Sequence, residues 1–387
     1  MMLAARTRIR IRAVRRLLAL SCAIVLVDTI FYAALYPLVP YFRNEFGLSK
    51  SVVGVLSGAY GAGVLVGSAP GGFLASRSGV RVTALVGLTL MAMTSVMFAL
   101  VDTTWLLVLS RFVGGFGSAL SWVAAFTWLV DRAPEDRRAE LIGVMISSAV
   151  VGALLGPVLG SVAATIGLLP AFASVSVAGV VIAIWAALEP APAVSGDVSL
   201  LPALGTVRQP RFLTSLWFIG LSPLLFSVLA VLVPLDLHRL GWGAAAVGMV
   251  FLVSAIFEAL VHPLLGRWSD RSGYRPPVFA GLLASIGILL LLTWVGSPWV
   301  ISLLVVLAAG AFNATLVPGT ALFSRDTEKA GMDAAVAFAI TNFAWASGYA
   351  VGAPVGGFLA DLRGDALSYI SLSIVCLLTI VVVRRTA

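Results

Sequence analysis

The sequence predicts an all-α membrane protein whose twelve transmembrane helices form two six-helix bundles. Three observations predict it. The 387 residues are 60% apolar and only 11% charged, which is more apolar surface than a soluble domain of this size can bury. Twelve runs are each long enough to span a bilayer, which takes about 20 apolar residues. One short basic string also occurs twice, about half a chain length apart, as expected for two copies of one unit.

The expected helices occupy most of the chain. The first run is too long for the apolar core of a signal peptide, so we expect it to remain as a helix. Cys22 and Cys376 lie inside apolar runs and indicate neither a disulfide nor a metal site. The predicted spans are 17–40, 51–74, 82–101, 105–128, 141–166, 171–188, 212–233, 244–265, 276–294, 299–323, 333–359 and 366–383.

The basic residues predict the orientation in the membrane. With both termini in the cytoplasm, twenty of the 25 Lys and Arg residues fall on the cytoplasmic side and four on the outside, as the positive-inside rule requires. The net charge of +8 is therefore explained by the bilayer and does not indicate nucleic-acid binding. The Pro- and Ser-rich segment 189–211 predicts a cytoplasmic linker between bundles 1–188 and 212–387, which we expect to be parallel repeats.

The repeated string predicts two gating loops, at 72–81 and 266–275. We expect both loops to latch the cytoplasmic side. Their Arg side chains can bond carbonyls at helix C-termini and nearby acids such as Asp131, Glu135 and Asp326. The residues of these loops that we single out are Gly72, Arg77, Gly79, Arg81, Gly266, Asp270, Arg271, Gly273 and Arg275.

Asp28 is the acid that lies deepest in the first half. It is about 18 Å from the end of the first helix at ~1.5 Å per residue, and Tyr32 and Tyr36 follow it on the same side. A charge within a bilayer costs about 2.5–3.5 kcal/mol. That cost favours a functional carboxylate on a polar cavity over the alternative, a structural hydrogen bond to a neighbouring helix.

Arg111 lies inside the fourth span and needs an anion. Asp28 is the natural partner, because no other acid lies deep in that half. We expect substrate and proton to compete for this carboxylate. The alternative is an Arg that extends toward the outer interface.

In the second half, Glu258 lies about 12 Å from the inner end of its helix at ~1.5 Å per residue, with His262 four residues on and hence on the same face. This pair predicts a proton relay. The alternative, a Glu258 that stays protonated and hydrogen-bonded, is equally compatible with the sequence.

The eleventh span carries a stripe of larger side chains on one face, at spacings of four, three and four residues. Asn313 adds a polar group from the tenth span. Such a stripe predicts the lining of a binding cavity for an aromatic or amphipathic solute, although ordinary packing between helices fits it as well. The stripe consists of Phe338, Asn342, Trp345 and Tyr349.

Small residues recur every four positions in the fifth span, at Gly152, Gly156 and Gly160. They predict close approach of another helix. Pro157 removes one backbone hydrogen bond and predicts a bend. We interpret this segment as a packing and hinge device without chemistry of its own.

Together these pieces resemble the major facilitator superfamily, and within it the twelve-helix drug:proton antiporters. The two loop strings are similar to the family's signature after helices 2 and 8. Arg111 with Gly115 and Gly117 resembles its helix-4 signature, the run from Gly152 to Gly160 resembles the helix-5 signature of antiporters, and Asp28 followed by Pro37 resembles helix 1 of multidrug exporters. One departure is Ser76, which stands where the family has an acid in the first loop.

The resemblance implies a monomeric proton-coupled antiporter of a bacterial inner membrane, with small amphipathic or cationic organic compounds as substrates. From their depth and spacing we expect Asp28, Arg111, Glu258 and His262 to couple protons. Protons, a small solute and the lipid bilayer are the expected partners, and no cofactor, metal or nucleic acid is expected. Two alternatives are kept: an uncoupled facilitator or exporter of sugars or metabolites on the same fold, and, more remotely, a polytopic membrane enzyme. We expect a transporter rather than an enzyme.

Overall fold

The chain folds almost entirely into helices in a computed structural model, which describes residues 2–134, 137–190, 205, 208–332 and 334–385. Among these described residues, seven α-helices and one 3-10 helix precede position 191. The helices up to that position are α1 Met2–Ala33, η1 Tyr36–Leu38, α2 Val39–Phe46, α3 Lys50–Ser78, α4 Val80–Leu100, α5 Thr104–Arg132, α6 Arg138–Ile166 and α7 Leu168–Leu188. Those after it are α9 Pro210–Arg239, α10 Ala244–Ser272, α11 Arg275–Leu292, α12 Pro298–Lys329, α13 Ala334–Arg363 and α14 Asp365–Arg385.

The predicted twelve-helix membrane fold is confirmed. In the described part of the chain, eleven helical segments are long and apolar enough to cross a membrane, the first of them running from Val14 through α2 to Phe46. The twelfth is α13. It is 30 residues long and carries Asn342 and Tyr349, and it packs between α3 and α9.

The first spanning segment is not the continuous helix that the sequence predicts. The α-helix α1 ends at Ala33, η1 follows at Tyr36–Leu38, and α2 continues to Phe46. Pro37 and Pro40 lack the N–H groups that would continue the α-helical pattern. The break leaves main-chain carbonyls at the end of α1 without partners in their own helix.

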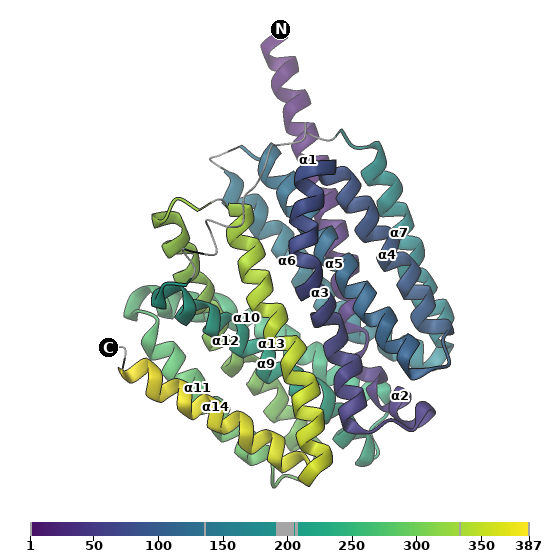
Figure 1. The fold of residues 1–387 in the computed structure, drawn as a ribbon, viewed down its shortest axis with the longest axis vertical. Helices are drawn as coiled ribbons and strands as arrows, with labels where there is room; N and C mark the ends of the chain where they lie inside the picture. Colours follow the sequence, from purple (N-terminus) through teal and green to yellow (C-terminus); the bar gives the residue numbers. More distant parts are fainter. Residues whose placement is uncertain (1, 135–136, 191–204, 206–207, 333, 386–387) are drawn as a thin grey trace.

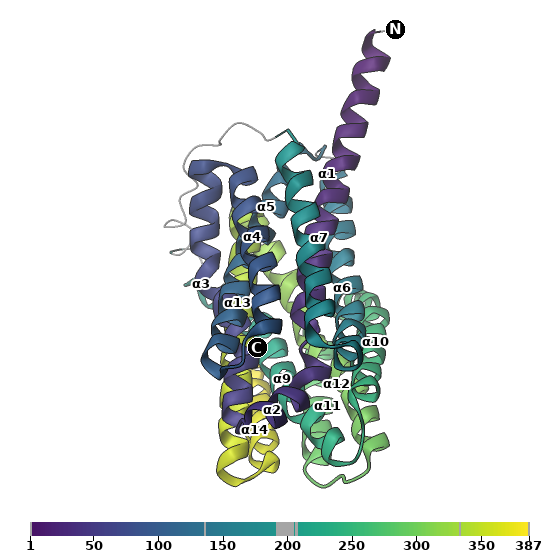
Figure 2. The same ribbon diagram turned by 90° about the vertical axis from the view of Figure 1, so that its right-hand side faces the viewer.

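Figures 1 and 2 show α1 to α7, in purple to teal, beside α9 to α14, in teal-green to yellow. We call them the first and second halves. The N-terminal turns of α1 project from one end of the molecule, which we call the linker end, and α2 lies at the opposite end, which we call the α2 end. Equivalent pairs recur in the two halves, because α1 packs on α6 as α9 packs on α13.

The two most extensive helix crossings between the halves are α3 with α13 and α6 with α10. Both depend on residues without a side chain. A Cβ at Gly54 would lie 2.3 Å from the carbonyl oxygen of Ala353, and a Cβ at Gly248 would lie 2.9 Å from that of Pro157. Both crossings lie toward the α2 end, so the halves are in close contact there.

The small residues of α6 pack against α1, as their spacing predicts. A Cβ at Gly152, Gly156 or Gly160 would lie 2.6 Å or less from an atom of α1 or the residue after it. Pro157 lies inside α6 without ending it. The stripe therefore sets how closely α6 approaches the helix that carries Asp28.

The two predicted gating loops are mostly helical, which corrects the prediction of loops at 72–81 and 266–275. Helix α3 continues to Ser78 and α10 to Ser272, so Gly72, Arg77, Gly266, Asp270 and Arg271 all lie on helices. The turns themselves are centred on Gly79 and Gly273, whose φ angles are 86° and 79°. Positive φ angles favour glycine. They let the chain reverse direction more sharply than it would in the longer polar loops predicted from composition.

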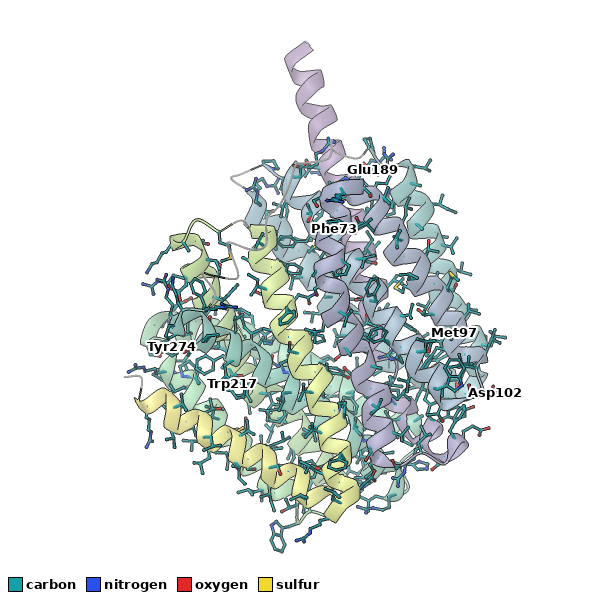
Figure 3. The ribbon with its side chains drawn as sticks, in the orientation of Figure 1. Phe73, Met97, Asp102, Glu189, Trp217 and Tyr274 are labelled. Carbon is teal, nitrogen blue, oxygen red and sulfur yellow. The ribbon has the colours of Figure 1, made fainter. Side chains whose placement is uncertain are left out.

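The contacts of the loop arginines differ in part from those predicted. Arg81 donates to the carbonyl oxygen of Glu189 at the end of α7, as expected for an Arg at a helix C-terminus. Arg77 lies over the Phe73 ring, 4.4 Å from its centre; Figure 3 labels Phe73 and Glu189 near the linker end. Asp131 lies 4.0 Å from its neighbour Arg132, and Glu135 falls outside the described residues.

Candidate functional site

A cavity of ≈ 390 Å³ lies between the two halves. Nine of the residues predicted to bind substrate or couple protons line it: Asp28, Tyr32, Tyr36, Glu258, Asn313, Phe338, Asn342, Trp345 and Tyr349. Residues that the sequence analysis did not single out also line it, among them Tyr60, Ser118, Trp122, Phe226 and Phe251. The structure therefore brings side chains from both halves to one central site.

Asp28 is held in the wall of this cavity by three donors. Its Oδ1 accepts a hydrogen bond from the Tyr60 hydroxyl at 3.0 Å. Its Oδ2 accepts from the Ser118 hydroxyl and from the Trp122 indole N–H, both at 2.8 Å. The residue is 3% exposed. Bonds to an ionised acceptor are stronger than neutral ones, so these donors stabilise the carboxylate where burial alone would disfavour it.

None of these three donors was among the residues predicted from the sequence. Ser118 and Trp122 are four residues apart on α5, hence on one helix face, and both bond the same oxygen of Asp28. That spacing of two polar groups was the available signal. No such sequence signal marked Tyr60, because a single Tyr in an apolar helix is usually a core residue.

Arg111 does not pair directly with Asp28, which corrects the expected partnership. The guanidinium donates instead to the carbonyl oxygens of Phe31 at 3.3 Å and Tyr32 at 3.2 Å. These two carbonyls belong to the last turn of α1, where the carbonyl groups have no N–H donors within the helix and where the helix dipole is negative. Arg111 thus caps the broken end of α1 and lies outside the cavity lining.

Aromatic rings complete the binding of Arg111. It is 1% exposed, and its guanidinium carbon lies 4.8 Å from the centre of the Tyr60 ring and 5.4 Å from that of Phe31. Such faces attract a cation. Since Tyr60 also donates to Asp28, the two charged groups share a neighbour without touching.

Aromatic rings also make up much of the cavity wall. Tyr32 contacts Tyr60, Tyr349 and Trp345, with ring centres 5.1, 5.2 and 5.8 Å apart. Trp345 and Tyr349 stack on each other at 5.6 Å. Because Tyr32 belongs to the first half and the other two to α13, this cluster crosses between the halves beside Asp28.

Phe338 closes another part of the wall. Its ring stacks on Phe126 at 4.2 Å with an interplanar angle of 8°, and on Trp122 at 6.1 Å. Phe126 and Trp122 lie on α5, so this stack also joins the halves. It places Phe338 next to a donor of Asp28.

Glu258 and His262 come together as their spacing predicts. The His262 Nε2 lies 3.4 Å from the Glu258 Oε1, and the two side chains are 30% and 33% exposed. Glu258 lines the cavity whereas His262 does not. Asn313 lies in the same half and is oriented by a bond from its amide to the carbonyl of Ala309 at 2.8 Å.

The electrostatic character of the site follows from its lining. Of the described residues that line the cavity, Asp28 and Glu258 are acidic, and none is Lys or Arg. Carboxylates together with aromatic faces suit a positively charged organic group. Within the described residues, no group of three or more His, Cys, Asp or Glu side chains is placed to hold a metal ion.

Comparisons with known proteins agree with this architecture. Over 273 residues, the chain is 29% identical to "Uncharacterized MFS-type transporter YcaD" of Escherichia coli O139:H28 (strain E24377A / ETEC), which covers 68% of this chain and 70% of the relative. It is similar in fold to a bacterial homolog of the human lysosomal transporter Spinster, with a TM-score of 0.77 and 17% identity over 96% of this chain and 95% of that one. It is also similar in fold to the nucleoside transporter NupG, with a TM-score of 0.76 and 14% identity over 95% of this chain and 98% of that one.

The family itself is identified by sequence. The family described as Major Facilitator Superfamily matches residues 21–235 and 216–386, and these two ranges together cover nearly all the spanning helices. With the twelve helices and the central cavity, this match establishes that the chain is a transporter of the Major Facilitator Superfamily.

Proposed function

We propose that this transporter is a proton-coupled antiporter that exports small amphipathic or cationic organic compounds. The observation that carries the proposal is the Asp28 carboxylate, held by Tyr60, Ser118 and Trp122 in the wall of a cavity that is rich in aromatic side chains. A carboxylate in this position needs a positive charge nearby, and either a proton or a cationic solute can supply it.

Competition for one carboxylate accounts for the coupling. Arg111 is engaged with the carbonyls of α1, so Asp28 has no fixed counter-ion in direct contact. A cationic solute in the cavity would neutralise it and make the proton unnecessary. Proton and cargo then bind in alternation, which is the requirement for antiport.

The cavity also supports the proposed substrate class. Aromatic side chains from both halves, such as Tyr36, Phe251 and Trp345, surround the space next to Asp28. An aromatic face can add about 0.5–2 kcal/mol to the binding of a cation. A compound with a charged end and an apolar body would match both features. We assign Glu258 to a second polar region of the same cavity, with His262 beside it outside the lining.

Orientation and movement follow from the charges and the two halves. We propose that the linker end is cytoplasmic, in a bacterial inner membrane, because most of the basic residues lie there. Bundles 1–188 and 212–387 would rock about the cavity as bodies joined by 189–211, and the protein would act as a monomer. The gating turns at Gly79 and Gly273 would then lie on the cytoplasmic side.

The test is transport by purified protein in proteoliposomes with an acidic lumen. We expect ethidium, an aromatic cation, to accumulate in the lumen as protons leave it. Asp28→Asn should abolish this accumulation while keeping the gel-filtration profile of the parent chain. Asp102→Asn is the matched control and should transport normally, because Asp102 is exposed, does not line the cavity and lies at the edge of the molecule (Figure 3).

Two results would reject the proposal. Gradient-driven accumulation by a folded Asp28→Asn variant would remove Asp28 from the coupling mechanism. Ethidium flux in the parent chain that does not respond to the pH gradient would instead identify an uncoupled facilitator.

A further inference from the structure

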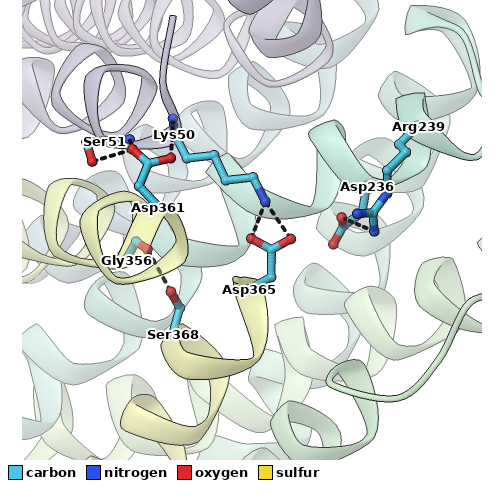
Figure 4. A network of polar contacts seen from close by, with 8 residues as sticks. All are labelled: Lys50, Ser51, Asp236, Arg239, Gly356, Asp361, Asp365 and Ser368. Carbon is cyan, nitrogen blue, oxygen red and sulfur yellow. Dashed lines mark hydrogen bonds and ion pairs between the residues drawn. The ribbon is translucent and has the colours of Figure 1, made fainter. Parts of the chain in front are cut away.

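We propose that Asp361, Lys50 and Asp365 form a latch, here called the α2-end latch, that holds the α2 end closed by capping a helix of one half with an acid of the other. The inference rests on the alternating access proposed above but not on proton coupling. Figure 4 shows the group, in which Lys50 and Ser51 come from α3, Asp361 from α13, and Asp365 from α14.

The cap consists of three hydrogen bonds to one carboxylate. Asp361 Oδ1 accepts from the main-chain N–H of Lys50 at 3.0 Å, and Oδ2 accepts from the N–H of Ser51 at 2.7 Å and from its hydroxyl at 2.5 Å. These partners are more than 300 residues away in the chain. A carboxylate at a helix N-terminus is favoured by both the free N–H groups and the helix dipole.

The first turn of α3 shows what this cap contributes. Four N–H groups at the start of a helix lack partners in the helix itself. Ser49 serves one of them through its side chain, which accepts from Val52 N at 3.3 Å, while the Val53 N–H donates to the Ser49 carbonyl at 3.0 Å as the first bond within the helix. Two more of the four, on Lys50 and Ser51, are served by Asp361. Half of the N–H groups that α3 itself cannot satisfy at its start are therefore bonded by an acid of the opposite half of the molecule.

An ion pair adds a second bond between the halves. Lys50 Nζ lies 2.5 and 2.6 Å from the two carboxylate oxygens of Asp365. The side chains are only 15% and 13% exposed, so this pair is less screened than a surface pair, whose contribution is usually small. Asp236 and Arg239 form their own pair at 2.9 Å beside it.

The surrounding backbone keeps the two acids together. Ser368 of α14 donates to the carbonyl of Gly356 in α13 at 2.7 Å, which ties the helix of Asp365 to that of Asp361 (Figure 4). A Cβ at Gly357 would lie 2.2 Å from the carbonyl oxygen of Lys50. The absence of a side chain there lets α3 come close enough for the cap to form.

Opening the α2 end requires α3 to leave α13, and this breaks the cap and the ion pair together. Loss of the Asp361 charge should therefore favour the state in which the α2 end is open. Hydrogen bonds to charged groups are among the stronger ones, and we expect the equilibrium to shift about tenfold or more toward the open state.

Two cysteine reporters measure this shift in the full-length chain. Cys22 and Cys376 are first replaced with Ser. Ser57→Cys then reports on the α2 end, because Ser57 is 2% exposed and shares the face of α3 that packs on α13. In a separate chain, Ile146→Cys reports on the cavity, which it lines while being 44% exposed. The rate of reaction with a membrane-impermeant maleimide is measured for each.

In both Asp361→Ala and the milder Asp361→Asn, the Cys at position 57 should react about tenfold faster, and the Cys at position 146 should react more slowly. Glu45→Gln removes an exposed acid at the same end and should change neither rate. Lys50→Met and Asp365→Asn should each accelerate the first reporter, and the double variant should add little to the larger single effect.

The outcomes separate the latch from the coupling proposal. Rates within about twofold of the parent in both Asp361 variants would overturn the latch. Faster reaction at both reporters would also overturn the latch. A loosened fold exposes both positions, whereas a shifted equilibrium exposes position 57 and makes position 146 less accessible. A failure of pH-driven transport alone would leave these rates unaffected.

Discussion

Replacing Gly160 with alanine should force α6 away from α1 and destabilise the fold. A Cβ at this position would lie 2.1 Å from the carbonyl oxygen of Ala34 and 2.6 Å from the Pro37 side chain. Ordinary contact begins at 3.4 Å, so the new methyl group is more than an ångström too close to backbone. The neighbour cannot relieve this by a change of rotamer, because the nearest atom belongs to the main chain.

The magnitude follows from the packing. Overpacking a filled interface typically costs about 1–3 kcal/mol. Gly143 provides a matched control on the same helix, since a Cβ there would have no atom within 4 Å. Gly143→Ala should be neutral or stabilising by up to about 1 kcal/mol, because alanine is the better helix former. The two variants should therefore differ by about 1–4 kcal/mol.

The measurement is the thermal unfolding midpoint of each variant in the same detergent. We expect Gly160→Ala to unfold well below the parent chain and Gly143→Ala at or above it. Equal midpoints for the two variants would refute the close approach of α6 to α1, and with it our account of how this stripe positions the helix of Asp28.

Two further changes test other parts of the site. Arg111→Lys keeps a charge but cannot bond both carbonyls at the end of α1 with a planar fork, so it should lower stability by about 1–3 kcal/mol; a melting midpoint equal to that of the parent would exclude the capping role. Phe338→Leu removes the ring that stacks on Phe126 and faces the cavity, and should weaken ethidium binding about three- to tenfold, measured by calorimetry, while binding of tetramethylammonium, which has no ring to stack, changes less than twofold. Equal losses for both ligands would indicate general damage to the cavity.

Much of this organisation could be predicted from the sequence because the bilayer imposes it. Twelve spans and their order follow from length and hydropathy. The residues singled out by depth or periodicity, such as Asp28, Glu258 and Trp345, do line the cavity. A large polar or aromatic residue inside a membrane helix is costly next to lipid, so it faces a cavity or another helix.

The donors to Asp28 could not be predicted with the same ease. They lie on α3 and α5, and their positions depend on how these helices pack against α1. The direct pairing of Arg111 with Asp28 was the wrong inference for a related reason. Only acidic side chains were considered as partners for Arg111. The two main-chain carbonyl oxygens at the broken end of α1 bind its guanidinium instead, and they carry no formal charge that the sequence would reveal.

The α2-end latch could not be predicted from the sequence either. Lys50, Asp361 and Asp365 lie at helix ends, where charged residues are common and usually solvated. Their significance comes from contacts across more than 300 residues of chain, which composition cannot reveal. The predicted loops were wrong for a simpler reason, because a basic polar string can remain helical until a single glycine ends it.

The central claim is that a proton and a cationic cargo compete for the Asp28 carboxylate. Proton release on binding tests this most directly. Ethidium is added to purified protein in weakly buffered detergent solution with a pH-sensitive dye, across a series of starting pH values. The account predicts that the parent chain and Asp102→Asn release protons when ethidium binds, and that Asp28→Asn binds without release. Equal proton release by Asp28→Asn and the parent would contradict it.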